Sequence, residues 1–176
     1  MTFSMDLSRY SALETLRNGR MIEIRAIKPE DRNELMKTVG RASKDSIYRR
    51  FFSTRRDFSD KEVDYYLDVD FTNHVALVAV LEEAGCPIIA GGGRYIVYQP
   101  GCAELAFGLE DAYQGLGIAS VLMRHIAELA CKAGLDELHA DVLPGNLSML
   151  KVFKSSGLPV STKRTQDTLH ITLRLR

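Results

Sequence analysis

Residues 102–134 read CAELAFGLEDAYQGLGIASVLMRHIAELACKAG, which is an apolar strand, a glycine-containing turn and an amphipathic helix in direct succession. Apolar side chains recur at helical spacing over 117–133, and Gly134 is suited to end that helix. The first turn of a helix leaves backbone N–H groups without partners and carries partial positive charge. The turn Gln114-Gly115-Leu116-Gly117-Ile118-Ala119, together with Ser120, is therefore predicted to bind a phosphate or diphosphate group.

The same turn has two other interpretations. Two glycines before a helix are common, so this helix could simply start after a flexible turn. The spacing Gly115-x-Gly117-x-x-Ser120 also imitates the G-x-G-x-x-G motif of dinucleotide-binding folds. Against that motif, its third glycine is a serine here, and hairpin-linked strands come before the turn, about two thirds along the chain. A dinucleotide-binding enzyme is therefore a minor alternative.

Outward from this stretch, hydrophobic periodicity predicts a mixed α/β (α+β) chain. Strands are expected at 21–27, 75–81, 87–97, 102–109, 137–143, 160–164 and 169–175. Helices are expected from Pro29, over 44–52, from Ser59, over 117–133 and over 146–156. This order predicts a largely antiparallel central sheet flanked by helices, and not the strict alternation of a doubly wound fold.

Two local features of the chain carry further expectations. Residues 1–19 are interpreted as an N-terminal extension with one short helix around 11–16, and residues 20–176 as a single domain. The glycine run 91–93 lies inside an expected strand, which predicts a bulge or a close approach of two backbones.

Composition excludes several classes of function. Lys plus Arg equals Asp plus Glu at 23 each, which argues against a protein that coats nucleic acid. Three cysteines without a C-x-x-C motif predict neither a disulfide framework nor a zinc site, and His139-x-Asp141 lacks an evident third ligand. No metal is expected. The sequence shows no signal peptide and no run of about 18 apolar residues, so we expect a cytoplasmic protein without a membrane partner.

Two motifs resemble a known family. Gln114-x-x-Gly117-x-Ala119 resembles the Q/R-x-x-G-x-G/A signature of the GNAT family of N-acetyltransferases. Asn146, with Gly157 following, falls where that family often has N…G-F after a short strand. The resemblance covers residues 21–176 and implies a GNAT-type sheet whose turn holds the pyrophosphate of acetyl-CoA by backbone amides. It also implies that Asn146 binds the pantetheine arm, although Asn favours a helix N-cap equally.

Residues 46–52, SIYRRFF, and 69–78, VDFTNHVALV, resemble the acetyltransferase domain of bacterial protein-lysine acetyltransferases. This narrower resemblance implies a primary amine as acceptor, on a protein lysine or on a small molecule. We expect direct attack of that amine on acetyl-CoA in a ternary complex, and an enzyme that is a monomer or a homodimer.

Acetyl transfer to an amine requires a base, because a lysine amine with a pKa near 10.4 is only about one part in a thousand unprotonated at pH 7. Glu104 precedes the turn on the same strand, and its segment resembles the one that holds the catalytic Glu of lysine-acetylating relatives. We predict Glu104 as the base, with its apolar neighbours raising its pKa. The alternative is a surface Glu on the polar face of an alternating strand.

The resemblance implies two further roles. The backbone N–H of Leu109 is expected to stabilise the oxyanion. Many relatives place an acid, Tyr, at the position that Phe153 holds here, so no general acid is assigned and Phe153 is expected to pack against the pantetheine arm. The missing Tyr leaves open a non-catalytic acyl-CoA-binding or regulatory domain, which is an alternative from a different class.

Overall fold

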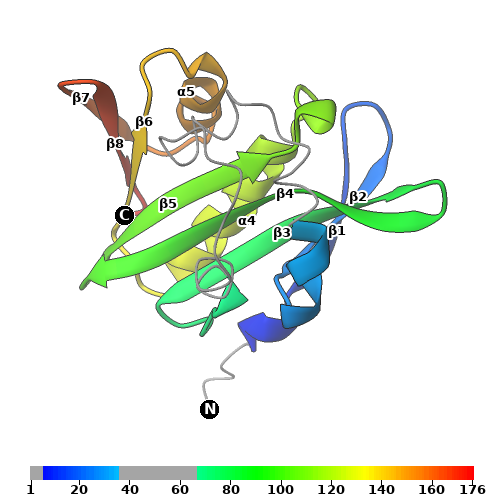
Figure 1. Ribbon diagram of the computed structural model, residues 1–176. Helices are drawn as coiled ribbons and strands as arrows, with labels where there is room; N and C mark the ends of the chain where they lie inside the picture. Colours follow the sequence, from blue (N-terminus) through cyan, green and yellow to red (C-terminus); the bar gives the residue numbers. More distant parts are fainter. Residues whose placement is uncertain (1–5, 36–66) are drawn as a thin grey trace.

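The computed structural model describes residues 6–35 and 67–176 (Figure 1). The helices expected over 44–52 and from Ser59 lie outside the described residues. The helix expected at Pro29 begins there as the short 3₁₀ helix η2, Pro29–Asp31, and continues as helix over 32–35. No helix in the described part of the chain is long and apolar enough to cross a bilayer.

The described residues form one eight-stranded sheet with the strand order β1-β2-β3-β4-β5-β6-β8-β7. Its strands are β1 Ser11–Thr15, β2 Met21–Ala26, β3 His74–Glu83, β4 Cys86–Gln99, β5 Cys102–Leu109, β6 Glu137–Val142, β7 Val160–Thr165 and β8 Thr168–Arg174. Every neighbouring pair is antiparallel except β5 with β6. The predicted mixed, largely antiparallel sheet is confirmed.

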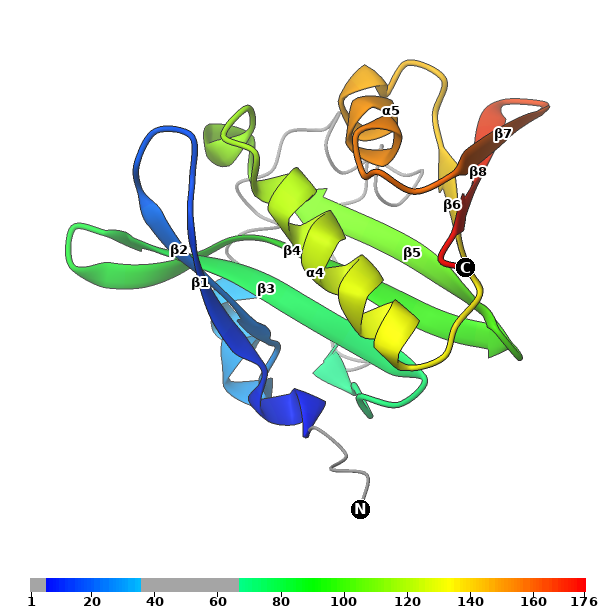
Figure 2. The same ribbon diagram turned by 180° about the vertical axis from the view of Figure 1, so that it is seen from behind.

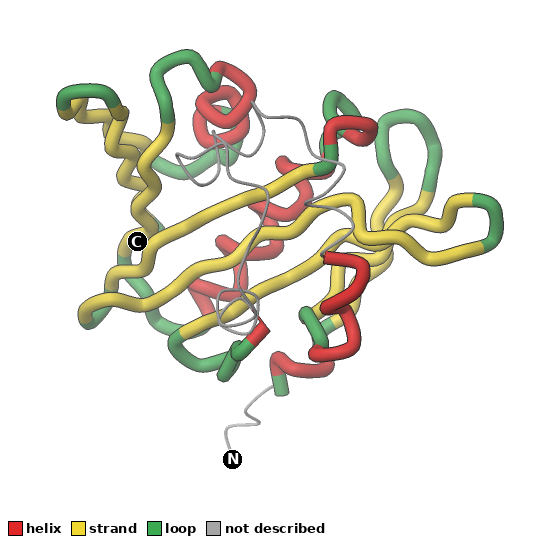
Figure 3. Tube along the Cα trace, in the orientation of Figure 1, coloured by secondary structure: helices red, strands yellow, loops and turns green. Residues whose placement is uncertain are grey.

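The helix α4, Ile118–Lys132, crosses one face of this sheet over β3, β4 and β5 (Figure 2). Its apolar stripe, which includes Ile118, Leu122, Ile126 and Leu129, is at most 2% exposed and forms the main core with the sheet. Besides η2, the other helical segments of the described residues are α5 Leu147–Lys154 and the short 3₁₀ segments η1 Leu7–Arg9 and η3 Asp111–Tyr113 (Figure 3). The helix predicted over 117–133 is confirmed, with Gly117 before its first residue.

The N-terminal segment differs from its prediction. Ser11–Thr15 form the edge strand β1, paired with β2 from Ser11↔Arg25 to Thr15↔Met21, so the short helix expected there is wrong. The turn dipeptide Asn18-Gly19, with Gly19 at φ +86°, reverses the chain between the two strands. Residues 11–15 therefore form part of the sheet.

The glycine run brings β4 unusually close to its neighbours. The β3–β4 register shifts between Ala79 and Val80, which leaves Ala90 as the extra residue of a bulge. A Cβ added to Gly91 would lie 2.6 Å from the carbonyl oxygen of Gly108, and one added to Gly93 would lie 2.7 Å from Phe107 Cδ1. The predicted bulge and close approach are both confirmed, and they fix the position of β5.

We predict that Gly91→Ala destabilises the fold, because the new methyl group would meet the backbone of β5. Overpacking of this kind costs about 1–3 kcal/mol. Gly145→Ala is the matched control, since a Cβ there has no neighbour within 4 Å. Urea unfolding checks both variants. Equal midpoints for Gly91→Ala and the control would show that β4 and β5 have room to separate.

Candidate active site

The site begins where β5 and β6 separate. These parallel strands pair over only three residues, Cys102↔Glu137, Ala103↔Leu138 and Glu104↔His139. Beyond Glu104, β5 continues along β4, while β6 continues along β8, and the two strands diverge (Figure 1). Backbone groups on the open side of β5 are thus left without a strand partner.

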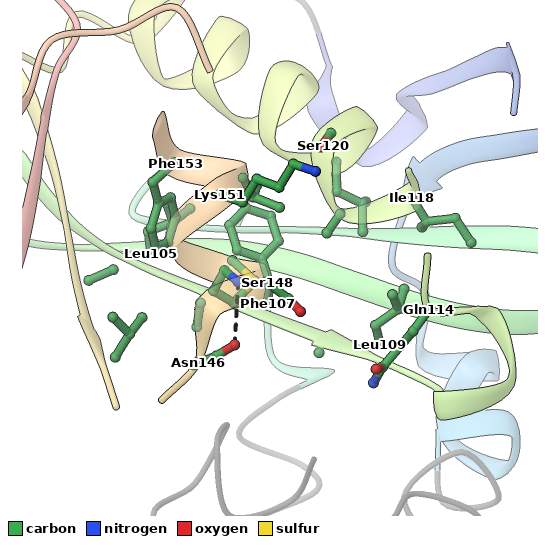
Figure 4. Close-up of a pocket in the computed structure, with 18 of the residues that line it drawn as sticks. Leu105, Phe107, Leu109, Gln114, Ile118, Ser120, Asn146, Ser148, Lys151 and Phe153 are labelled. Carbon is green, nitrogen blue, oxygen red and sulfur yellow. Dashed lines mark hydrogen bonds between the residues drawn. The ribbon is translucent and has the colours of Figure 1, made fainter. Parts of the chain in front are cut away.

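A cleft of about 410 Å³ lies in this opening (Figure 4). Its walls come from β5, from the turn and first residues of α4, from α5 and from the end of β6. Of the predicted site residues, the cleft is lined by Glu104, Leu109, Gln114, Gly115, Gly117, Ile118, Ala119, Ser120, Asn146 and Phe153. The structure therefore brings together residues that are up to 49 positions apart in the sequence.

One predicted turn residue does not line the cleft. Leu116 packs against the main hydrophobic core instead. A contact of Leu116 with the phosphate group is left to its backbone N–H and stays a prediction.

The start of α4 has the geometry of an anion site. Gly115 and Gly117 adopt φ +84° and +88°, in the left-handed region that favours glycine. The first helical bond runs from the Val121 N–H to the Gly117 carbonyl at 3.1 Å, and no side chain caps the helix. The earlier N–H groups of the first turn therefore have no helical acceptor, and they lie at the wall of the cleft.

Two basic residues that the sequence analysis did not single out also line the cleft. Arg17 comes from the β1–β2 hairpin, and Lys151 comes from α5. In Figure 4 the Lys151 side chain extends from α5 in the direction of Ser120, at the start of α4. The Asn18-Gly19 dipeptide was the available sequence signal for the hairpin, but nothing local in the sequence places Arg17 beside the turn.

Glu104 lies at the closed end of the opening, in register with His139 of β6. Its side chain is exposed, whereas Ala103 and Leu105 are 0% and 3% exposed, because alternate residues of a strand point to opposite faces. The expected apolar surroundings of Glu104 are therefore wrong: its sequence neighbours are buried on the other face. Glu104 nevertheless lines the cleft, and its exposed carboxylate is accessible to a second substrate or to a bridging water.

A chain of polar side chains lies on the same face as Glu104. His139 Nε2 is 3.0 Å from Glu137 Oε2, and His139 Nδ1 is 3.0 Å from His170 Nε2. His170 Nδ1 is in turn 2.9 Å from Asp141 Oδ1. Burial and the nearby Cys102, Glu137, Glu104 and Asp141 raise the pKa of Tyr98, which shows that acidic groups gather here.

The same region corrects one argument about metals. Ligand atoms of Cys102, Glu137 and His139 all lie within 4.8 Å of one another, so the expectation that His139 lacks further possible ligands is wrong. Both ring nitrogens of His139 take part in hydrogen bonds within this part of the chain. The absence of a metal stays a prediction.

The side chain of Asn146 caps a helix. Its Oδ1 accepts a hydrogen bond from the Met149 N–H at 3.3 Å, shown as the dashed line in Figure 4. The N-cap interpretation is confirmed, and Asn146 is only 6% exposed at the cleft wall. A pantetheine contact is left to its remaining polar atoms and stays a prediction.

Phe153 is 2% exposed, and its ring centroid lies 6.3 Å from that of Phe107. It is thus mainly a core residue that reaches the cleft wall. Tyr113 lies outside the cleft lining, and its hydroxyl donates to Glu83 Oε1 at 3.0 Å. Burial first, and then this hydrogen bond, raise the pKa of Tyr113. Among the described residues that line the cleft, none is a tyrosine.

The direction of the β5 backbone can be followed from one hydrogen bond. The Glu110 N–H donates to the Ala90 carbonyl of β4 at 2.7 Å. Because successive amides of an extended chain point to opposite sides, the Leu109 N–H points away from β4, toward the opening. The predicted oxyanion donor thus has a suitable direction.

Comparison with known proteins gives a consistent assignment. Residues 44–158 match the sequence profile described as "Acetyltransferase (GNAT) family". The chain is similar to Acetyltransferase PA5475 of Pseudomonas aeruginosa, at 29% identity over 93% of this chain and 88% of that protein. It is also similar to Acetyltransferase Pat of Mycolicibacterium smegmatis, at 31% identity over 81% of this chain, but it spans only 42% of that protein's length.

A solved structure agrees in fold and in sequence. The crystal structure of the GNAT domain of S. lividans PAT superposes with a TM-score of 0.84 at 31% identity, covering 93% of this chain and 96% of that domain. The opening between β5 and β6, the uncapped start of α4 and these similarities lead to one assignment. The chain belongs to the acetyltransferase (GNAT) family and is an acetyltransferase.

Proposed function

We propose that this enzyme transfers the acetyl group of acetyl-CoA to a primary amine, on a protein lysine or on a small molecule, by direct attack in a ternary complex. Members of the family use acetyl-CoA. The observation that supports the proposal is the cleft itself. It has a helix start suited to phosphate at one end and a carboxylate, Glu104, at the other, and β5 connects the two.

The turn and the first residues of α4 fit the diphosphate of CoA. Their backbone N–H groups have no helical acceptor, and glycines at 115 and 117 keep side chains out of the way. From there, β5 offers its open edge to the extended pantetheine arm. Five residue steps separate Glu104 from Leu109, and they correspond to about 17 Å of strand at about 3.3 Å per residue.

In this proposal Glu104 removes the proton that the incoming ammonium must lose. Because five residue steps of strand separate Glu104 from Leu109, its exposed carboxylate would receive that proton through bridging water molecules. The Leu109 N–H then donates to the oxygen that gains charge as nitrogen attacks the thioester carbon. A fixed amide is effective in this role because it needs no reorganisation as the charge develops.

The departing sulfur has no assigned proton donor. A free thiol has a pKa of about 8.5, so a thiolate is an acceptable leaving group near neutral pH without a general acid. Phe153, at the position where relatives often have Tyr, is consistent with such a route. The buried position of Phe153 also gives it a structural role beside Phe107.

The charge of the acceptor end favours a cationic amine. Glu104 and Asp141 both line the cleft. Glu137 is close to them, because it is hydrogen-bonded to His139, the register partner of Glu104. The resemblance of residues 46–52 and 69–78 to bacterial protein-lysine acetyltransferases makes a protein lysine the first acceptor class to test. No metal, nucleic acid or membrane takes part in this proposal, and the enzyme acts as a monomer or a homodimer in the cytoplasm.

Ligand-dependent unfolding tests the binding half of the proposal. We expect acetyl-CoA and CoA to stabilise the protein, because a ligand at 100 times its dissociation constant adds about 2.7 kcal/mol to the free energy of unfolding. For a chain of this size that is roughly 5–10 °C in the unfolding midpoint. NAD is the control ligand and should produce no shift. A shift with NAD alone would support the dinucleotide-binding alternative.

Glu104→Gln tests the catalytic half. With a panel of lysine peptides and small primary amines, we expect the rate of CoA-thiol release to fall by roughly 10²–10⁴-fold. Acetyl-CoA affinity should change little, because the carboxamide keeps the size of the side chain and the phosphate site is distant. Glu128→Gln is the matched control, since Glu128 is an exposed residue of α4 paired with Lys132.

The assignment of the base depends on the difference between these two variants. A Glu104→Gln enzyme with the rate of the wild type would remove Glu104 from the mechanism. A protein that binds acetyl-CoA tightly but turns over none of the amines would support the non-catalytic alternative. Binding titrations on the same samples distinguish that result from loss of the fold.

A further inference from the structure

The side chain of Arg17 lies against the turn that begins α4. A Cβ added to Gly117 would be 3.3 Å from Arg17 Nε and 3.6 Å from its Cζ. Arg17 also lines the cleft, although it lies 100 residues before Gly117 in the sequence. A guanidinium group is thus positioned beside the N–H groups that have no helical acceptor.

Within residues 6–35 and 67–176, Arg17 takes part in no ion pair or side-chain hydrogen bond. Three other arginines nearby are paired with carboxylates, at 2.7 to 2.9 Å: Arg20 with Glu83, Arg25 with Asp31 and Arg124 with Glu14. Within the described residues the Arg17 side chain differs from these three, and it lies next to the uncapped start of α4.

The hairpin that carries Arg17 is rigidly built. The Leu16 N–H donates to the Arg20 carbonyl at 2.8 Å, and the Gly19 N–H donates to the Leu16 carbonyl at 2.9 Å. Asn18 closes the turn by accepting from the Arg20 N–H at 3.0 Å. Leu16 itself is only 4% exposed, so the backbone beside Arg17 is anchored in the core.

A second set of contacts attaches this hairpin to α4. His125 of α4 is 4% exposed, and its Nε2 is 2.7 Å from Glu14 Oε1 of β1. Arg124 contacts the same oxygen at 2.9 Å, and Tyr10 is hydrogen-bonded to His125 Nδ1. The strand before Arg17 is therefore fixed to the helix that begins directly after Gly117.

We propose that Arg17 is a phosphate ligand for CoA, supplied by the β1–β2 hairpin in addition to the backbone amides of the turn. This inference rests on the proposed function. Arginine presents several N–H donors in a planar fork and stays charged at all physiological pH values, which suits it to phosphate oxygens. Glu14, His125 and Arg124 position the hairpin, and they do not touch the ligand.

The experiment is a calorimetric titration of the full chain with CoA, comparing the wild type, Arg17→Ala and Arg17→Lys. We expect Arg17→Ala to weaken CoA binding by about 10–100-fold, as for loss of a charge-assisted hydrogen bond. Arg17→Lys should lie between the two, because it keeps the charge and loses the fork. Arg9→Ala is the matched control: Arg9 is 88% exposed and lies 3.8 Å from Asp6.

Dephospho-CoA identifies the phosphate group that Arg17 binds. If Arg17 contacts the diphosphate, Arg17→Ala weakens CoA and dephospho-CoA by the same factor. If it contacts the 3′-phosphate, only CoA binding is weakened, and the wild type itself prefers CoA. Both results support the proposal, and the salt dependence of CoA binding should fall in the variant.

Two different results would overturn the proposal that Arg17 is a phosphate ligand. Equal CoA affinity in Arg17→Ala and the wild type would exclude Arg17 as a ligand while leaving the proposed function intact. No CoA binding by the wild type up to millimolar concentration would exclude the proposed function, and this inference with it. Unfolding midpoints of the free variants should match that of the wild type, because Arg17 is exposed and unpaired within the described residues.

Discussion

The short parallel pairing of β5 and β6 is the constraint on which the rest of the site depends. β5 is held on its other side by β4 along its whole length, and β6 is held by β8 in the same way. The two strands share only the three pairs from Cys102↔Glu137 to Glu104↔His139. Beyond this short segment the two groups of strands diverge (Figure 1). The cleft is the space that results, and Glu104 lies at its closed end.

The glycine run of β4 and the turn before α4 serve this arrangement from opposite sides. Because Gly91 has no Cβ, β4 can approach the Gly108 carbonyl closely. This contact fixes the edge of β5 that pairs with β4, opposite the edge that faces the cleft. Gly117 gives the start of α4 a left-handed residue and leaves its first amides uncapped. Both features act through the backbone. A substitution that keeps the polarity of the site but adds a Cβ at either glycine therefore alters its shape.

Local patterns in the sequence predicted the local parts of this site, and they failed where distant segments meet. The bounds of β5 and α4 follow from periodicity and flanking turns, since each is set by its own residues. The alternation of apolar residues over β1 is short, and the helix expected there is wrong, although Asn18-Gly19 signals a hairpin. The surroundings of Glu104 depend on which face of the strand its side chain occupies. Ala103 and Leu105 are buried on the opposite face. The approach of Arg17 to Gly117 and of Cys102 to His139 results from strand order alone, and no short-range signal contains it.

The two ends of the cleft differ in charge, and this difference orients a reaction between two substrates. Arg17, Lys151 and the amides of α4 make the turn end positive. Glu104 and Asp141 make the β6 end negative. An anionic donor substrate is attracted to the first end and a cationic amine to the second, so each is repelled from the wrong end. In the proposed function, the acyl carbon and the amine then meet along the open edge of β5. The separation of two strands thus provides both the space for two substrates and the order in which they lie.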